Sequence, residues 1–507
     1  MKGLAKEYLI IRADASIEIG TGHVMRCLAL AQSWQDSGGK VTFATATDNP
    51  ALKVHLKSEG MKIVYLSVQP GSNDDAAQTA SLAKELGASW VVVDGYHFGA
   101  EYQRIIKDSR LRLLFIDDYG HADYYYADIV LNQNLHANEK LYKDKEPYTK
   151  LLLGSKYVLL RREFLKWREW KRKIPRIARK VLVTMGGGDP NNVTLKVIQA
   201  LKQVKVGDLE AVVVIGGNNL HFEELQAAIQ NSQIQIRLES NVTDMSKLMA
   251  WADIAVSAAG STSWELMFMN LPSIVLVLAE NQRSVAKCLS AKKVAINLGW
   301  HESISFNGIA KEIEKLLEAR ERRVEMAQCS QHLIDGEGAE RILMYLKGEE
   351  FRLRDVRKED CKLLWDWVND PDVRTAAFSS NLIPWKEHVN WFNQKLHDSN
   401  SFIFVALDRR DTPVGQVRFD VKDDDEAEID VSVDSGKRQL GYGNLIIHMG
   451  VEKIFYGTPI QTVHAFIKPH NKNSLRAFEK AGFKQLGTEM VKGNLSIHYV
   501  KGRDNEQ

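Results

Sequence analysis

The chain contains little cysteine, and no cysteine stands close to another. Four cysteines occur among 507 residues, at Cys27, Cys288, Cys329 and Cys361. Because no C-x-x-C pair exists, the sequence gives no sign of a zinc-binding or dithiol redox motif. Free cysteines are usually buried, and they persist in reducing compartments. We therefore expect four buried free thiols.

Long hydrophobic runs and an excess of one charge are also absent. No segment approaches the roughly 20 apolar residues that a membrane span needs. The apolar run of the N-terminal MKGLAKEYLIIRADAS is too short for a signal peptide and is followed by charge. The formal net charge of +2 gives no support for a nucleic-acid partner. These absences predict a cytoplasmic protein without a membrane or nucleic-acid partner, and they leave its oligomeric state open.

The first part of the chain alternates short β-rich apolar runs with amphipathic helical segments. Such alternation predicts an α/β fold, in which helices cover both faces of a parallel sheet. The strand-like runs are Tyr8–Ala13, Val41–Ala46, Lys62–Leu66, Trp90–Asp94, Arg112–Ile116 and Asp128–Asn132.

A charged stretch, Arg161–Lys180, follows, and we interpret it as a solvated connection. The alternation then restarts and closes with a long helical pattern from Asn307 to about Leu346. We therefore expect two Rossmann-like lobes of the glycosyltransferase-B type, at residues 1–165 and 166–346. Such lobes bind their ligand between the carboxyl ends of the strands.

Residues 350–507 have a different pattern. The runs Phe402–Asp408, Thr412–Val421 and Glu428–Val433 indicate an antiparallel meander, and helical segments lie on either side of it. This pattern predicts an α+β domain of ordinary size. Four tryptophans at helix-like positions are expected to pack in its core: Trp365, Trp367, Trp385 and Trp391.

The first candidate site follows the first predicted strand. Arg12-Ala-Asp14 ends that strand, and His23-Val-Met-Arg26 opens the next helix. Gly20 and Gly22 allow the intervening backbone to approach a ligand closely. A helix N-terminus offers free N–H groups to an anion, and the imidazole of His23 could accept a proton. The alternative is a histidine with a purely structural role, because the spacing is not the G-x-G-x-x-G fingerprint.

The second lobe has two similar turns. Met185-Gly-Gly-Gly-Asp-Pro190 follows a strand, and Ser257-Ala-Ala-Gly260-Ser-Thr-Ser-Trp-Glu265 leads into a helix. Backbone N–H groups in such turns can bind a diphosphate, although a plain glycine-rich turn is the alternative. A carboxylate at Glu265 can accept hydrogen bonds from two ribose hydroxyls. Asn281-Gln282 adds amides after the next strand.

These motifs carry a resemblance over about residues 5–345. Arg12-Ala-Asp14 with Ile19-Gly-Thr-Gly-His-Val-Met-Arg26-Cys-Leu-Ala-Leu-Ala resembles the opening motif of the UDP-2,4-diacetamido-2,4,6-trideoxy-β-L-altropyranose hydrolases of pseudaminic acid biosynthesis. Gly260–Glu265, Leu271-Pro272 and Asn281-Gln282 resemble their UDP site. That site is shared with two-lobed nucleotide-sugar glycosyltransferases such as the one that makes lipid II.

The resemblance implies metal-independent hydrolysis that releases UDP and the free diacetamido sugar. It implies His23 as the catalytic residue that acts on the attacking water, and Asp14 could orient His23 or the water. The residues expected to bind the substrate are Arg12, Gly20, Gly22, Arg26, Gly187, Gly188, Gly260, Ser261, Thr262, Glu265, Asn281 and Gln282.

A second pair of motifs lies in residues 350–503. Arg438-x-x-Gly441-x-Gly443 follows a strand and opens a helix, an arrangement that can cradle a pyrophosphate. Together with the segment Asn471-Lys-Asn-Ser-Leu-Arg-Ala-Phe478 it resembles the two acetyl-CoA motifs of the GNAT acetyltransferases. The resemblance implies acetyl-CoA as cosubstrate and no metal. The residues expected to bind acetyl-CoA are Val433, Arg438, Gln439, Gly441, Gly443, Asn444, Asn471 and Ser474.

The acetyltransferase motif departs from its relatives at one position. Phe478 stands where many GNAT enzymes have a tyrosine that protonates the departing thiolate, so the acid is left to Tyr499, His498 or water. Glu428 and Asp430 alternate along one strand and therefore share a face. Either carboxylate could take the ammonium proton through water, or both belong to a solvated strand face.

We therefore expect a bifunctional enzyme acting on UDP-amino-sugar substrates. The nearest GNAT subgroup N-acetylates the 4-amino group of UDP-4-amino-4,6-dideoxy-N-acetyl-β-L-altrosamine, and the hydrolase part would then remove UDP. One alternative is a UDP-sugar-dependent glycosyltransferase fused to a GNAT of other specificity. Another is a hydrolase with a non-catalytic acyl-CoA-binding regulatory module.

Overall fold

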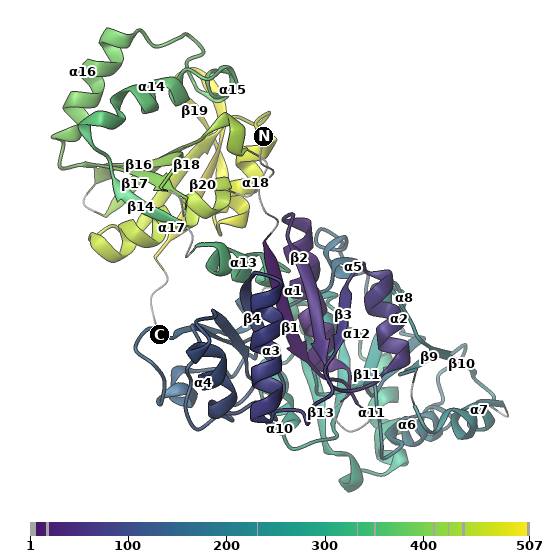
Figure 1. Ribbon diagram of the computed structural model, residues 1–507. Helices are drawn as coiled ribbons and strands as arrows, with labels where there is room; N and C mark the ends of the chain where they lie inside the picture. Colours follow the sequence, from purple (N-terminus) through teal and green to yellow (C-terminus); the bar gives the residue numbers. More distant parts are fainter. Residues whose placement is uncertain are drawn as a thin grey trace. The chain divides into compact units, whose positions relative to one another are not determined.

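The computed structural model describes residues 7–16, 20–217, 219–230, 232–331, 333–348, 351–408, 411–423, 425–438 and 442–503. The chain divides into two compact units, Met1–Leu343 and Met344–Gln507 (Figure 1). Within the described ranges, no helix is both long and apolar enough to cross a membrane. The predicted fold class is confirmed: two parallel-sheet lobes precede a mixed α+β domain. The predicted boundary at residue 165 stays a prediction.

The first unit begins with a seven-stranded parallel sheet in the order β3-β2-β1-β4-β5-β6-β7. Because β1 lies between β2 and β4, the strand order reverses there, and such a reversal opens a crevice at the carboxyl ends of the strands. The strands are β1 (Tyr8–Ala13), β2 (Lys40–Thr45), β3 (Lys62–Tyr65), β4 (Ala88–Asp94), β5 (Leu113–Ile116), β6 (Ile129–Asn132) and β7 (Lys150–Leu153). The helices are α1 (Gly22–Asp36), α2 (Pro50–Ser58), α3 (Asn73–Glu85) and α4 (Ala100–Asp108).

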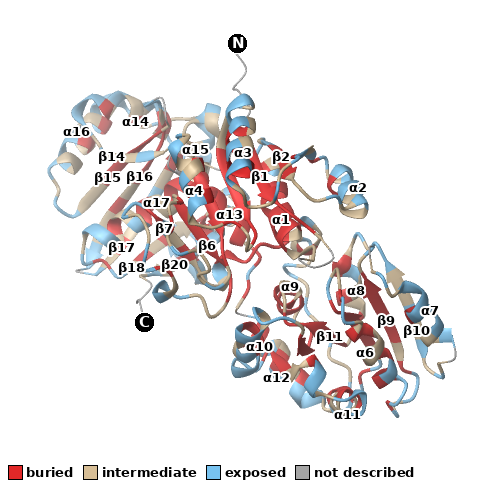
Figure 2. Ribbon diagram, turned by 60° about the horizontal axis from the view of Figure 1, so that its bottom comes forward, coloured by how far each residue is buried: buried red, intermediate tan, exposed pale blue. Residues whose placement is uncertain are grey.

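A second parallel sheet follows, in the order β10-β9-β8-β11-β12-β13, and its strand order reverses between β8 and β11. The strands are β8 (Lys180–Thr184), β9 (Glu210–Ile215), β10 (Gln235–Ser240), β11 (Ile254–Ala258), β12 (Ser273–Val277) and β13 (Ala295–Trp300). The helices are α5 (Arg162–Leu165), α6 (Val193–Leu201), α7 (Phe222–Gln230), α8 (Met245–Trp251), α9 (Thr262–Phe268), α10 (Gln282–Ala291), α11 (Phe306–Glu318) and α12 (Arg320–Ser330). Figure 2 shows the inner strands of both sheets buried and the outer helices exposed. Strands covered on both faces are apolar throughout, which explains the runs in the sequence.

Two sequence expectations for this unit were wrong. The pattern from Asn307 to Leu346 forms three helices, α11, α12 and α13 (Gly338–Gly348), because the chain leaves helical geometry at Ala319 and again before α13. The charged connection is not simply solvated. Arg161 is buried, and the guanidinium of Arg172 donates to the carbonyl oxygens of Met249, in the last turn of α8, and of Met269, directly after α9.

The second unit has a seven-stranded sheet in the order β14-β15-β16-β17-β18-β20-β19. The strands are β14 (Arg352–Asp355), β15 (Ser401–Leu407), β16 (Pro413–Asp423), β17 (Glu426–Val433), β18 (Thr462–Ile467), β19 (Lys484–Val491) and β20 (Asn494–Gly502). The helices are α14 (Cys361–Val368), α15 (Pro371–Ala376), α16 (Trp385–Leu396), α17 (Tyr442–Gly457) and α18 (Lys472–Lys480). Only β17 and β18 pair in parallel among the described strands of this sheet.

Two cores hold this sheet between helices. One core joins the sheet to α17 and α18, and the other joins it to α14 and α16. Trp367 is buried in the second core as expected, whereas Trp385 is 44% exposed, so its predicted core position was wrong. All four cysteines are free, but only Cys27 is buried, so the expectation of four buried thiols was wrong for the other three.

Candidate functional site

Loops from both sheets of the first unit meet where the two strand orders reverse. A Cβ atom on Gly22 would lie 3.2 Å from Oγ of Ser261, and one on Gly187 would lie 2.7 Å from Oγ1 of Thr21. A side chain at Gly187 would therefore push the two loops apart. The structure thus brings together three residues that the sequence placed in one substrate site, Gly22, Gly187 and Ser261.

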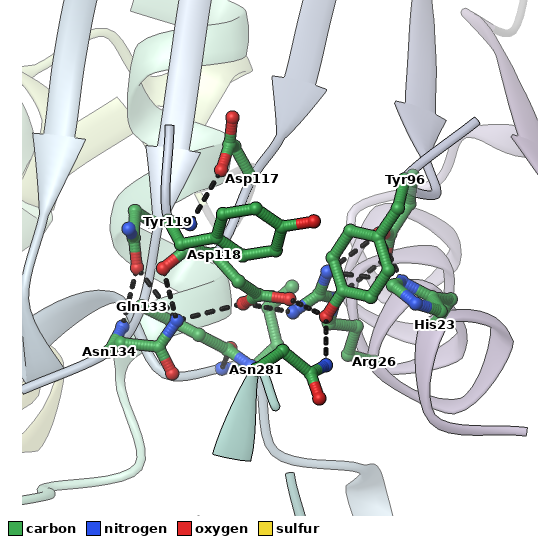
Figure 3. Close-up of polar contacts among 12 residues, drawn as sticks. His23, Arg26, Tyr96, Asp117, Asp118, Tyr119, Gln133, Asn134 and Asn281 are labelled. Carbon is green, nitrogen blue, oxygen red and sulfur yellow. Dashed lines mark hydrogen bonds and ion pairs between the residues drawn. The ribbon is translucent and has the colours of Figure 1, made fainter. Parts of the chain in front are cut away.

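His23 lies on the first turn of α1, beside the end of β4. Its Nδ1 is 2.7 Å from Oδ1 of Asp94, and its ring packs edge-on against Tyr96 (Figure 3). Because a carboxylate can only accept, Nδ1 carries the hydrogen. Nη2 of Arg26 also lies 3.2 Å from Nδ1, but the Asp94 oxygen is the closer partner, so we assign the hydrogen to Nδ1. In the neutral ring Nε2 then holds the lone pair. This tautomer is the one in which a histidine can take a proton from a ligand or water.

Arg26 fixes the carboxylate that holds His23. Its Nε and Nη2 donate to the two oxygens of Asp94 at 2.6 Å each, and its Nη1 donates to Asp118 at 2.7 Å. Burial acts to raise the pKa of Asp94, but the charge of Arg26 and the hydrogen bonds from Arg26 and His23 outweigh it and lower that pKa. The pKa of Asp118 is likewise held below its usual value, mainly by Arg26 against the effect of burial. Both carboxylates are therefore ionised at neutral pH.

Tyr96 connects this network to the second sheet. Its hydroxyl donates to Asp118 at 2.7 Å and accepts from the Nδ2 of Asn281 at 2.9 Å (Figure 3). Asn134, after β6, donates to the other oxygen of Asp118. One hydrogen-bond network thus joins residues that follow β4, β5 and β6 to Asn281, a predicted UDP-site residue at the start of α10.

Arg12 and Asp14 do not take the positions expected for them. Arg12 is completely buried, and its guanidinium donates to both oxygens of Asp75 at 2.9 and 2.7 Å. Asp14 accepts from the backbone N–H of Ala46 and pairs with His97 and Arg12. The register of β1 and β4 places Asp94, not Asp14, beside His23. In this structure Arg12 and Asp14 therefore belong to an interior network, and Asp94 rather than Asp14 contacts His23. The predicted roles of Arg12 and Asp14 stay predictions.

Glu265 is already paired in this structure. Arg161, from the charged connection, donates to Oε1 of Glu265 at 2.9 Å and lies 3.1 Å from Glu163. Burial raises the pKa of Glu163 to about 7, because it outweighs the attraction of Arg161. A ribose could bind Glu265 in the expected way only after Arg161 moves or shares that carboxylate.

A cavity of about 130 Å³ opens beside the start of α1, at the carboxyl ends of β1, β2 and β3. Its wall is mostly apolar, with polar groups from the segment that precedes α2. Val24, which follows His23, is part of this wall. The lining residues are Ala13, Ala15, Val24, Phe43, Thr45, Thr47, Asp48, Asn49, Leu52, Lys53, Leu56, Ile63 and Tyr65. The cavity could hold a small group with an apolar end.

The remaining substrate residues of the sequence prediction lie in turns at the same edges. Gly20 has a φ of +76°, a backbone conformation that favours glycine. Gly188 is in the turn after β8, Gly260 and Thr262 are at the start of α9, and Gln282 begins α10. The side chain of Gln282 accepts from the backbone N–H of Leu278 and so stabilises its own turn.

The described acetyl-CoA residues lie at the ends of β17 and at the starts of two helices. Val433 ends β17, Gly443 and Asn444 are on the first turn of α17, and the Asn471 side chain caps α18 by accepting from the N–H of Ser474. The predicted residues Gln439 and Gly441 lie outside the described residues. The guanidinium of Arg438 binds Asp370 and Asp372, both at 2.7 Å. Its side chain is therefore held by carboxylates rather than left open to a phosphate.

The candidate acid and bases of the second unit have separate environments. Tyr499 is buried and donates to Glu479 at 2.6 Å, and burial with this hydrogen bond raises its pKa. Because Tyr499 belongs to the same buried core as Phe478 and its hydroxyl hydrogen is held by Glu479, a role as general acid requires that this bond break. Glu428 pairs with Lys422 at 3.0 Å, and Asp430 is 54% exposed near Arg418. The roles of these three residues stay predictions.

Sequence reasoning missed several residues of the first site. Asp94 ends a predicted strand, and Tyr96, Asp118 and Asn134 each follow one by two residues; the carboxyl ends of parallel strands meet at one edge. Their place at the carboxyl ends of predicted parallel strands could therefore have identified these residues as site candidates. No local pattern distinguished Arg161, because its partner Glu265 is far away in sequence.

Two family models match the chain. Residues 181–342 match the Glycosyltransferase family 28 C-terminal domain, and residues 350–484 match the Acetyltransferase (GNAT) domain. The second unit is therefore a GNAT domain, and the second lobe is of the glycosyltransferase family 28 type.

Three curated relatives are similar at low identity. An uncharacterized protein of Methanocaldococcus jannaschii is 25% identical over 98% of both chains. A spore coat polysaccharide biosynthesis protein of Bacillus subtilis is 25% identical over 66% of this chain and 97% of its own length. A UDP-2,4-diacetamido-2,4,6-trideoxy-β-L-altropyranose hydrolase of Campylobacter jejuni is 26% identical over 56% of this chain and 96% of its own length. The chain thus joins a region similar to a named nucleotide-sugar hydrolase to a GNAT domain, as the sequence motifs predicted.

Proposed function

We propose that the first unit hydrolyses UDP-2,4-diacetamido-2,4,6-trideoxy-β-L-altropyranose to UDP and the free sugar. The observation that carries this proposal is the His23–Asp94 pair, which leaves Nε2 of His23 as a base at the edge where both sheets meet. Similarity to the Campylobacter jejuni hydrolase supports the substrate.

The chemistry needs one base and a stabilised leaving group. Nε2 of His23 takes a proton from water while the water oxygen attacks the anomeric carbon, and the bond from that carbon to the diphosphate oxygen breaks. The bond electrons leave with UDP. Asp94 holds the imidazole in the required tautomer and Arg26 fixes the Asp94 carboxylate, while turns at Gly187 and Ser261 would supply backbone donors for the diphosphate. Glu265 binds the ribose once Arg161 has moved.

The cavity beside α1 supplies a place for a substituent of the sugar. Its volume of about 130 Å³ and its apolar wall suit an acetamido methyl group, and Thr45 and Asn49 can hydrogen-bond the amide. An acetamido group would place its methyl against the apolar wall and its amide against the polar groups.

For the second unit we propose acetyl-CoA-dependent acetylation of the 4-amino group of UDP-4-amino-4,6-dideoxy-N-acetyl-β-L-altrosamine. The GNAT match supports acetyl transfer, and the neighbouring hydrolase-like unit supports the acceptor. Acetylation would then precede hydrolysis, because the hydrolase substrate carries both acetamido groups.

The deciding experiment is mass spectrometry of the full chain with the 4-amino nucleotide sugar, with and without acetyl-CoA. We expect UDP and the free diacetamido sugar only when acetyl-CoA is present. Accumulation of the acetylated nucleotide sugar would reject the hydrolase, and an unchanged substrate would reject the acetyl acceptor. The preacetylated compound then tests the hydrolase alone.

A glycosyltransferase is the second candidate, because the second lobe matches the glycosyltransferase family 28 model. It differs in one measurable property: UDP release would depend on an added sugar acceptor. A non-catalytic acyl-CoA-binding module, suggested by Phe478, would bind acetyl-CoA without turnover.

A further inference from the structure

The cavity beside the start of α1 has an apolar wall and a polar one. Apolar side chains from α1, α2, β2 and β3 form most of the lining. The polar side chains other than the exposed Tyr65 lie on the segment from the end of β2 to α2, and they are Thr45, Thr47, Asp48, Asn49 and Lys53. Asp48 and Lys53 carry opposite charges at exposed positions, so they give the cavity no net charge. The remaining three side chains determine which hydrogen bonds it offers.

The hydroxyl hydrogens of Thr45 and Thr47 are taken up inside the protein. Oγ1 of Thr45 lies 3.0 Å from Oδ1 of Asp14, and Oγ1 of Thr47 lies 3.5 Å from that carboxylate oxygen and 3.3 Å from Oγ1 of Thr45. Because a carboxylate only accepts, the two hydroxyls donate to it or to each other. One lone pair on each hydroxyl oxygen receives a backbone N–H, from Thr47 and from Ala15. The pair thus keeps a lone pair, and no free hydrogen, for a ligand.

Asp14 is held as an acceptor by its other partners. Its Oδ1 accepts from the backbone N–H of Ala46 at 2.8 Å and lies 2.7 Å from Nη1 of Arg12. Its Oδ2 lies 3.1 Å from Nε2 of His97. Burial acts to raise the pKa of Asp14, but the interactions with His97 and Arg12 outweigh it and lower that pKa. The carboxylate is therefore ionised at neutral pH and has no hydrogen to give to the threonines.

Asn49 offers the opposite kind of group. Its Oδ1 accepts from the backbone N–H of Leu52 at 3.1 Å and so caps α2. This bond fixes which end of the amide is the oxygen. The Nδ2 of Asn49, which can only donate, forms no hydrogen bond with the part of the chain that the structure describes. The cavity therefore combines an acceptor pair, a donor and an apolar wall.

This combination matches an acetamido group. The N–H of such a group needs an acceptor, its carbonyl oxygen needs a donor, and its methyl group needs an apolar wall. A protonated amine has no acceptor atom and would leave Nδ2 of Asn49 without a partner. A hydroxyl group would leave the apolar wall uncovered. A site whose polar groups pair with one substituent discriminates against a substituent that cannot pair with them.

We propose that Thr45, Thr47 and Asn49 recognise an acetamido group of the sugar, and that Asp14 is the positioning residue that fixes the threonine pair as acceptors. The inference rests on the proposed hydrolysis. The start of α1, which carries the proposed base, belongs to the same cavity wall. The group recognised is thus a substituent of the sugar ring, either at C2 or at C4. Hydrolysis then selects nucleotide sugars that are already acetylated at that position.

The first test is calorimetry of nucleotide-sugar binding to the full chain, in a His23→Gln background that removes the proposed base. Replacing both Thr45 and Thr47 by valine keeps their shape and removes the acceptors. Affinity for the diacetamido nucleotide sugar should fall about 5-fold while UDP affinity is unchanged. Thr42→Val is the matched control, because this hydroxyl is on the same strand, has no partner and is outside the cavity. No loss in the double variant, or an equal loss in the control, would overturn the proposal.

Asn49→Asp tests the donor. An aspartate can still cap α2, so thermal unfolding should be unchanged, but Nδ2 is replaced by an acceptor. Affinity for the diacetamido nucleotide sugar should fall. If the cavity holds the C4 substituent, affinity for the 4-amino nucleotide sugar should rise, because the new carboxylate attracts its ammonium. If the cavity holds the C2 acetamido group, affinity for both compounds should fall. Unchanged affinity for both would reject this site.

Asp14→Asn tests the positioning role. The asparagine amide can donate to Thr45 and so turn a hydroxyl hydrogen toward the cavity. KM for hydrolysis of the diacetamido nucleotide sugar should rise about 5-fold with kcat unchanged, because the lost contact is a binding contact. A fall in kcat at unchanged KM would contradict the positioning role. The threonine and Asn49 variants decide the proposal if thermal unfolding shows that Asp14→Asn is not folded.

UDP-N-acetylglucosamine separates this inference from the proposed substrate. It carries one acetamido group, and UDP-glucose has a hydroxyl group in its place. A wild-type preference for UDP-N-acetylglucosamine that disappears in the double threonine variant supports the cavity even where the diacetamido compound is not hydrolysed. Conversely, hydrolysis of the diacetamido compound with an affinity that no cavity variant weakens overturns this inference and leaves the proposed function intact.

Discussion

Nδ1 of His23 lies 2.7 Å from Oδ1 of Asp94, and the same carboxylate receives two hydrogen bonds from Arg26. His23 and Arg26 belong to one helix, and Asp94 ends a strand about 70 residues away in sequence. The helix thus supplies both the candidate base and the cation that fixes its partner. The lone pair on Nε2 of His23 follows from this arrangement.

Replacement of His23 should abolish UDP release. His23→Gln removes the base, so we expect the hydrolysis rate to fall by about 10² to 10⁴ while acetyl transfer is unchanged. Hydrolysis is measured as UDP released from the preacetylated nucleotide sugar. His55→Gln on α2 is the matched control. Hydrolysis at the wild-type rate in His23→Gln would exclude this residue as the base.

Replacement of Asp94 by asparagine should act on the tautomer of His23. The amide can donate to Nδ1 and so favour a hydrogen on Nε2, which removes the lone pair from the catalytic position. We expect kcat to fall by about 10-fold or more with little change in UDP affinity, measured by calorimetry. Asp14→Asn is the comparison variant, because the sequence alone predicted that Asp14 orients His23. A loss of kcat in Asp14→Asn combined with normal activity in Asp94→Asn would favour Asp14 as the partner of His23.

Replacement of Gly443 tests the acetyl-CoA cradle. A Cβ atom at this position would meet Val433 and Ala477 only at 3.8 and 3.9 Å, so Gly443→Ala should fold normally. We expect weaker acetyl-CoA binding, because the methyl group would enter the space next to the pyrophosphate. Acetyl-CoA affinity is measured by calorimetry, and thermal unfolding confirms folding. Unchanged affinity in a folded variant would place the pyrophosphate elsewhere.

The cavity beside α1 should control the choice of sugar. Val24→Phe adds volume to the wall, so we expect KM for the diacetamido substrate to rise by roughly 10-fold or more. UDP affinity should stay unchanged, because the proposed UDP site is in the second lobe. A KM equal to that of the wild-type chain would show that no substituent of the sugar binds in this cavity.

The raised pKa of Glu163 should make the first unit less stable as pH rises. Its folded pKa of about 7 exceeds the usual 4.5, so the folded state binds the proton more tightly. The stabilisation is complete below pH 4.5 and is lost as pH rises through 7, by up to roughly 3 kcal/mol at 1.36 kcal/mol per pKa unit. Glu163→Gln should flatten this dependence in urea unfolding between pH 5 and 8. A wild-type free energy of unfolding that rises over this range would contradict the pKa.

The sequence by itself determined the periodicity of the elements and the local motifs. The apolar run Tyr8–Ala13 became a strand with the predicted bounds, because both faces of this sheet are covered. Glycines next to His23 and the segment before α17 predicted turns that open helices. Their resemblance to hydrolase and GNAT motifs agrees with the relatives and family models that match the chain. These features depend on neighbours along the chain, which a sequence shows directly.

The tertiary structure decided which side chains meet. Asp14 is close to His23 in sequence, but the pairing of β1 with β4 places Asp94 beside the imidazole. The sequence predicted that Glu265 binds a ribose, and the fold brings Arg161 into a hydrogen bond with its carboxylate. The contact of Asp14 with Thr45 likewise depends on β1 lying next to β2, and the hairpin that contains β20 was not predicted at all. Such contacts depend on strand order and register, which link residues far apart in the chain and leave no periodic signal in either segment.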